Sequence, residues 1–164
     1  MDLGGRRVHL LCAGHGAPTV VLEPSGLGTV LAYQPVIAAL SPGQRVCAHD
    51  RAGQGWSDAT PDPVDARHQA DDLARLLDSA GEAPPYLLVA SSAAWFGLPR
   101  LLDPLEPGLS GSELAGVETR WQAAQAQFAQ QVHAPPVSRV HSGHLIASDR
   151  PDAVVAAVRG LLNR

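Results

Sequence analysis

Ser92 is the residue whose type and setting point most directly to chemistry. It follows the apolar run Tyr86–Ala90, and a helical pattern comes after it. An apolar run of this length that ends in small residues is typical of a buried parallel strand turning sharply into a helix. In a nucleophile elbow a serine occupies the tip of such a turn, with small residues two positions before and after it. Those positions hold Ala90 and Ala94. The pattern predicts Ser92 as a nucleophile, with Ser91 as a less well-spaced alternative.

A nucleophilic serine needs a base that takes its proton and hydrogen-bond donors that stabilise the oxyanion. His144 follows the last predicted strand and is preceded by Gly143, so we predict it as the base. The glycine-rich loop around Leu27 also follows a predicted strand, and Ala93 follows the serine. We predict the backbone N–H groups of Leu27 and Ala93 as the oxyanion hole. Ligands of open α/β sheets bind beyond the carboxyl ends of the strands, where all four residues would lie.

The elements that must position these residues alternate along the chain. Strands are predicted over Arg7–Cys12, Pro18–Glu23, Arg45–His49, Tyr86–Ala90 and Pro136–Val140. The link between the first two is short enough for a hairpin. Helices are predicted from Pro35 to Leu40, over 65–80, over 114–132 and from Pro151 onward. This order predicts one α/β domain over residues 1–164, with a mostly parallel sheet of about five strands flanked by helices.

Composition narrows the function classes. The chain has 164 residues, 45% of them hydrophobic and 17% charged, and a net charge of −4. It has no basic cluster, so a nucleic-acid partner is not expected. No apolar run is long enough to cross a bilayer, and the N-terminus lacks the order of a signal peptide. Cys12 and Cys47 lie in apolar strand-like runs, where free cysteines behave as small hydrophobic residues. We therefore expect a cytoplasmic protein without a disulfide framework.

Several motifs carry a resemblance to a known family. They are Gly14-x-Gly16-x-Pro18-Thr19, Ser25-Gly26-Leu27-Gly28, Asp50-Arg51-Ala52-Gly53-x-Gly55-Trp56-Ser57-Asp58 and Ser142-Gly143-His144. Together they resemble the α/β-hydrolase superfamily, over residues 3 to 94 and from Trp121 to the end. The resemblance implies hydrolase chemistry without a cofactor, with the serine before the histidine along the chain. We interpret Asp50 and Arg51 as structural residues that fix the loop after the third strand.

The chain also departs from the family pattern. Family members carry a cap and two further strands between the elbow and the histidine, where this chain has only Trp95 to Arg120. The acid that orients the histidine is therefore not assigned; Asp103 is one candidate. Because strands lie about 4.8 Å apart, losing two would move the last strand about 10 Å along the sheet. The loop carrying His144 must then compensate, or a second chain must supply the missing neighbour. An uncovered strand edge would also favour a homodimer.

The leading hypothesis is a serine hydrolase of the esterase type that acts on a small ester-type substrate. Its rival is a catalytically inactive remnant of the same fold that serves as a binding module; the alanines around Ser92, Pro99 and the missing strands favour that interpretation. A metal site on His133, His141 and His144 is a weaker alternative, because no cysteine or second-shell carboxylate supports it. No metal and no cofactor are expected.

Overall fold

The computed structural model describes residues 1–24, 28–63, 65–90 and 146–163, with the single residues 116, 119, 123, 126, 127, 130 and 140. The chain divides into two compact units. The first comprises Met1–Ser92 with Leu145–Arg164, and the second comprises Ala93–His144. The arrangement as one domain stays a prediction.

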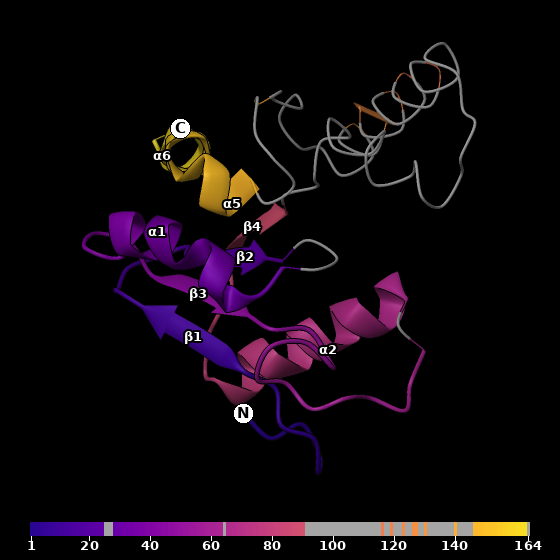
Figure 1. Cartoon of the computed structure of the whole chain (residues 1–164). Helices are drawn as coiled ribbons and strands as arrows, with labels where there is room; N and C mark the ends of the chain where they lie inside the picture. Colours follow the sequence, from indigo (N-terminus) through magenta and orange to yellow (C-terminus); the bar gives the residue numbers. More distant parts are fainter. Residues whose placement is uncertain are drawn as a thin grey trace. The chain divides into compact units, whose positions relative to one another are not determined.

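The first unit is built on a sheet of four strands (Figure 1). The strands are β1 (Leu10–Ala13), β2 (Thr19–Glu23), β3 (Val46–His49) and β4 (Tyr86–Ala90). Their order is β1-β3-β2-β4. β2 is parallel to both β3 and β4, and β1 is antiparallel to β3. The predicted mostly parallel α/β sheet is therefore confirmed, with four strands in the described part of the chain. The predicted fifth strand lies outside it, except for Val140, which is not in a strand.

The predicted hairpin between the first two strands is wrong, because β1 pairs with β3 instead of β2. The burial of the strands gives the physical reason. Thr19 to Leu22 of β2 are buried, whereas all four residues of β1 are only partly buried. A strand covered on both faces belongs in the interior of the sheet. β2 therefore lies between β3 and β4, and β1 takes the edge.

The expectation of free cysteines is also wrong. The β1–β3 register sets Cys12 directly opposite Cys47, and the two form a disulfide. The pairing depends on a register between strands 35 residues apart, which neither apolar run reveals on its own. Since the cytoplasmic expectation rested partly on unpaired cysteines, it loses that support and stays a prediction.

Helices cover both faces of the sheet in the first unit (Figure 1). Helices α1 (Val30–Leu40), α5 (Ile146–Asp149) and α6 (Pro151–Leu162) lie on one face, and α2 (Ala66–Ser79) lies on the other. The main core joins the strands to the first group, through residues that include Val20, Leu22, Val36 and Val158. On the other face Leu76 of α2 packs with Val8 and Leu3.

Helix α1 begins earlier than its sequence predicts. Pro35 was expected to open the helix, but it lies inside it, five residues after Val30. Proline there removes the N–H that would bond the carbonyl of Leu31. The helix nevertheless buries Val30 and Tyr33 in the core, and the Tyr33 hydroxyl donates to the Glu23 carbonyl at 2.7 Å. Tertiary packing thus overrides the local proline signal.

Helices α2 and α6 follow their sequence patterns closely. Asp65 caps α2, because its side chain accepts from the backbone N–H of His68 at 2.9 Å. Helix α6 begins at Pro151 as predicted. In the second unit, the described residues Gly116, Thr119, Ala123, Ala126, Gln127 and Gln130 are helical, in agreement with the helix predicted there. No helix within the described ranges combines the length and the hydrophobicity that a membrane crossing requires.

Candidate active site

The four predicted site residues, Leu27, Ser92, Ala93 and His144, lie outside the described residues. The elements that carry three of them are described. β2 and β4 are parallel neighbours, and their last residues, Glu23 and Ala90, are register partners. The loop with Leu27 and the segment with Ser92 therefore start side by side at the carboxyl edge of the sheet, the edge where α/β proteins bind ligands.

The segment that follows His144 is anchored to helix α1. α5 starts at Ile146, and Ala147 is buried in the main core with Val30. The Ser148 hydroxyl donates to the Ala32 carbonyl at 3.2 Å, in the first turn of α1. That turn follows directly on the loop with Leu27. Helix α5, which starts two residues after His144, is thus fixed against the first turn of α1.

Asp50 organises the same edge. Its side chain is fully buried and accepts hydrogen bonds from the backbone N–H groups of Val30 at 2.7 Å and Trp56 at 3.1 Å. His9 Nδ1 lies 2.8 Å from Asp50 Oδ2. Gly55 leaves the space that this carboxylate needs, because an added Cβ would lie 2.3 Å from Oδ2. The interpretation of Asp50 as a structural residue is confirmed.

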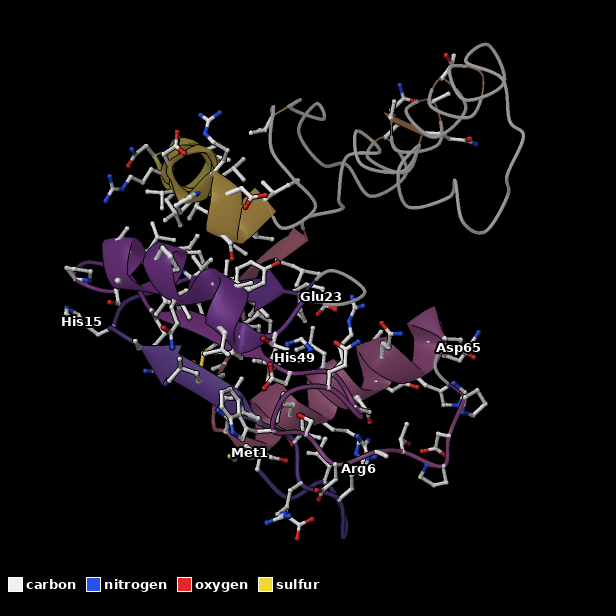
Figure 2. All side chains as sticks on the ribbon, viewed as in Figure 1. Met1, Arg6, His15, Glu23, His49 and Asp65 are labelled. Carbon is white, nitrogen blue, oxygen red and sulfur yellow. A yellow bond between two sulfur atoms is a disulfide. The ribbon has the colours of Figure 1, made fainter. Side chains whose placement is uncertain are left out.

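Glu23 and His49, the last residues of β2 and β3, lie near each other (Figure 2). Arg51, just past β3, pairs with Glu23 and completes a second group. The Arg51 guanidinium donates to Glu23 Oε1 at 2.6 and 2.8 Å, which confirms a structural role for Arg51. His49 Nε2 lies 3.5 Å from Glu23 Oε2. Burial lowers the pKa of His49, because desolvation of the imidazolium outweighs the attraction of nearby carboxylates. The ring is therefore neutral near pH 7.

Sequence reasoning did not nominate Glu23 or His49 as site residues. A polar residue at the last position of a buried strand was the available signal, because that position lies at the ligand-binding edge. The position alone does not tell a satisfied core residue from a functional one. His49 differs from a satisfied residue in one respect: its buried Nδ1 has no hydrogen-bond partner among the described residues.

Cys12, Cys47 and Glu82 are the described group whose ligand atoms lie close enough to share a metal ion, within 4.8 Å of one another. Their chemistry does not fit a metal. The two sulfurs are joined in a disulfide, so neither is a thiolate. Glu82 already accepts hydrogen bonds from Arg45 and Thr19. The histidine set His133, His141 and His144 lies outside the described residues.

Solved structures share this arrangement of strands and helices. An alpha/beta hydrolase fold protein from Burkholderia ambifaria aligns with 100% of this chain and 98% of its own, with a TM-score of 0.64 and 16% identity. The chain has the α/β-hydrolase fold. Wild-type Cfl2 from Burkholderia cenocepacia aligns with 98% of this chain and 94% of its own, with a TM-score of 0.65 and 17% identity.

Two curated proteins are similar to parts of the chain. "Putative carbamate hydrolase RutD" of Azorhizobium caulinodans is 38% identical over 68 residues, which is 41% of this chain and 26% of that protein. "Probable transporter efuK" of Hormonema carpetanum is 36% identical over 100 residues, which is 57% of this chain and 14% of that protein. The chain thus spans about a quarter or less of either relative. No family model matches it.

Proposed function

We propose that this α/β-hydrolase chain is a serine hydrolase of the esterase type that acts on small ester-type substrates. Ser92 is the nucleophile and His144 the base. The backbone N–H groups of Leu27 and Ala93 form the oxyanion hole. The observation that carries the proposal is the pairing of Glu23 with Ala90 across two parallel strands, because it starts two of the three catalytic segments at one point of the sheet.

Chain connectivity limits how far these residues can lie from the described edge. Ser92 is two residues past Ala90, so their Cα atoms are at most about 7 Å apart. Leu27 follows Glu23 by four residues and precedes the first helical residue, Val30, by three. His144 precedes Ile146 by two residues, again a span of at most about 7 Å. Because α5 is held against the first turn of α1, these limits support a common site despite the shortened chain.

The reaction proposed for this site needs no cofactor. Ser92 Oγ attacks the ester carbonyl while the imidazole of His144 takes its proton. The two N–H groups stabilise the tetrahedral oxyanion. The alcohol leaves with the proton from His144, and water then hydrolyses the acyl-serine by the same steps. The name of the RutD relative, a carbamate hydrolase, supports hydrolase chemistry in general and leaves this substrate class a proposal.

A fluorophosphonate probe, which reacts with activated serines, tests this function. We expect labelling of the wild-type protein and loss of labelling in both Ser92→Ala and His144→Ala. Ser91→Ala tests the neighbouring alternative, and Ser79→Ala, at the exposed end of α2, is the control; both should label like wild type. Labelling that persists in Ser92→Ala would exclude the proposed nucleophile.

The second candidate function is a binding module without catalysis. One observation favours it: a cavity beside His49 is lined by residues of the loop after β3 and of helix α2. Absence of labelling in a folded wild-type protein, together with binding of a small molecule at that cavity, would favour the binding module over the hydrolase.

A further inference from the structure

His9 and Asp50 form a histidine–carboxylate pair at the carboxyl edge of β3. His9 Nδ1 lies 2.8 Å from Asp50 Oδ2. The two oxygens of this fully buried carboxylate also accept the backbone N–H groups of Val30 and Trp56. Because Asp50 acts as an acceptor toward all three groups, the proton of a neutral His9 ring is favoured on Nδ1. Nε2 then keeps its lone pair and can act as a base or a nucleophile.

The second ring nitrogen of His9, Nε2, is accessible to solvent. The His9 side chain is 31% exposed. Nε2 makes no hydrogen bond to a described residue, and it is not among the buried polar atoms that lack a partner in this part of the chain. The two nitrogens of an imidazole point in widely different directions, so the bond from Nδ1 to the buried carboxylate turns Nε2 outward. His9 differs in this respect from His49, whose unpaired Nδ1 is buried.

The backbone of His9 is held on both sides. Its N–H donates to Ser57 Oγ at 2.9 Å, and its carbonyl accepts from the N–H of Asp50 at 3.1 Å. The Ser57 hydroxyl donates in turn to the Asp50 carbonyl at 2.6 Å. Asp50 therefore contacts both the ring and the backbone of His9. A group whose orientation is fixed before the substrate binds is suited to catalysis.

His9 lines an open hollow of about 350 Å³, a volume within the range of small-molecule sites. Trp56 is 61% exposed, and its ring centroid lies 5.1 Å from that of His9. An aromatic surface for a planar ring is therefore available beside the imidazole. The remaining lining is uncharged and mostly apolar: Leu11, Val30, Leu31 and Gln34. The hollow thus favours a neutral substrate with an aromatic ring.

We propose that His9 is a catalytic nucleophile for esters of phenols, which bind in this hollow with the aryl ring against Trp56. Nε2 attacks the acyl carbon, and the ester C–O bond breaks with its electron pair on the phenolate. Asp50 stabilises the positive charge of the acylated imidazolium ring. Water then attacks the acyl carbon and loses a proton, the N–C bond breaks, and the carboxylic acid leaves while Nε2 regains its lone pair.

The leaving group sets the substrate class. An imidazole nucleophile needs a weakly basic leaving group, and phenolates are much less basic than alkoxides. The activity therefore covers aryl esters and not alkyl esters. It uses neither Ser92 nor His144, so it does not rest on the serine hydrolase function proposed above.

Hydrolysis of p-nitrophenyl acetate by Ser92→Ala tests this activity, because the substitution removes the nucleophile of the proposed serine hydrolase. We expect the release of p-nitrophenolate to continue in this background and to saturate with ester. Adding His9→Asn should lower the initial rate about tenfold. Asparagine keeps an N–H near the position of Nδ1, and with it the bond to Asp50, but it has no Nε2.

His68→Asn in the same background is the matched control. His68 Nδ1 also lies 2.8 Å from a carboxylate, that of Asp65, but this carboxylate is 55% exposed and His68 does not line the hollow. The control should keep the rate of the background. Trp56→Ala should raise KM about threefold with little change in kcat, because it removes the aryl contact and keeps the backbone N–H that bonds Asp50.

NMR of the ring nitrogens in the wild-type protein tests the orientation of His9 without relying on a variant. We expect the proton of the neutral ring on Nδ1, where it bonds Asp50. A proton on Nε2 would overturn the proposal, as would equal rates with and without His9→Asn, or an equal loss in His68→Asn. Loss of all hydrolysis in Ser92→Ala would also overturn it and would leave the serine hydrolase standing, since the fluorophosphonate probe tests Ser92 separately.

Discussion

The backbone N–H of Val30 donates to Asp50 Oδ1 at 2.7 Å, and this bond joins the end of β3 to the first turn of α1. Asp50 lies just past β3, and Val30 lies just past the loop that holds Leu27. A buried carboxylate that accepts several N–H groups is held by strong, charge-assisted hydrogen bonds. Asp50 therefore fixes the start of the helix that follows the proposed oxyanion loop.

Asp50→Asn should destabilise the protein by about 3 kcal/mol. The amide keeps one acceptor oxygen but turns an NH₂ group toward one of the buried donors, so a hydrogen bond is lost and a donor is left unpaired. Urea unfolding followed by circular dichroism measures the change. The control is Asp152→Asn, whose carboxylate pairs with Arg150 on the exposed start of α6 and should give no measurable change. An unaltered midpoint for Asp50→Asn would contradict the role given to Asp50.

The disulfide should contribute to stability because it closes a long loop in the unfolded chain. Cys12 and Cys47 are 35 residues apart, and chain entropy for a loop of that length corresponds to about 3–4 kcal/mol. The double variant Cys12→Ser, Cys47→Ser should unfold at a lower urea concentration than the oxidised wild type. Adding dithiothreitol should shift the wild type toward the variant and leave the variant unchanged. Alkylation of the purified wild type followed by mass measurement counts its free thiols. Two alkylated cysteines would contradict the pairing.

Local sequence patterns predicted the elements whose signals lie within one segment. The apolar run Tyr86–Ala90 is β4, and the stripe ended by Gly81 is α2 with Asp65 as its cap. The partner of β1 and the Cys12–Cys47 pairing were not predictable in this way. The β1–β3 pairing and the disulfide both depend on which strand lies in the interior of the sheet. β2 lies there because it is buried on both faces, and the residues of β1 do not reveal this.

The site was predictable only in part. The strand ends that should carry Leu27 and Ser92 are neighbours, as the α/β pattern requires. The anchoring of α5 through Ser148 was not predicted, because the short helix Ile146–Asp149 has too few residues to show a periodic pattern. His49 was missed because a histidine in an apolar strand resembles any buried core residue. Its unpaired Nδ1 becomes visible only in three dimensions.

The sheet edge gives a prediction about assembly. β4 ends the strand order within the described part of the chain, and Leu88 of β4 is 55% exposed. We propose that two copies pair through this edge, because an apolar strand edge is a template for further pairing. Light scattering should give twice the chain mass of 17.1 kDa. Leu88→Lys should give a monomer, since it places a charge on the pairing strand.

Leu31→Lys is the matched control for that experiment. Leu31 is 54% exposed, almost as much as Leu88, but it lies on α1 and not at the edge. It should leave the dimer intact. A wild-type mass of one chain at high micromolar concentration, or equal dissociation by the two substitutions, would rule out pairing through β4.

The neutral state of His49 gives a prediction about acid stability. Burial holds the pKa of His49 below its usual value of 6.5, so below that pH the unfolded chain binds this proton more readily than the folded one. The free energy of unfolding should therefore fall as the pH drops below about 6.5, by at most about 1.4 kcal/mol per pH unit from this group. Well above pH 6.5 the group is neutral in both states and contributes no pH dependence.

Urea unfolding of wild type and His49→Gln between pH 7.5 and 5.5 measures this contribution. Glutamine does not titrate, so the variant should lose less stability than wild type over this range, and the difference between the two proteins should narrow as the pH falls.

Arg45 holds the pKa of the Glu82 carboxyl below its usual value of 4.5. The stabilisation from the Glu82–Arg45 pair is lost only as the pH falls below about 4.5, which is outside the pH range of this experiment. His15→Gln, in the exposed loop before β2, should keep the wild-type dependence. Parallel curves for wild type and His49→Gln would mean that the pKa of His49 is the same in the folded and the unfolded chain, which would contradict the effect assigned to its burial.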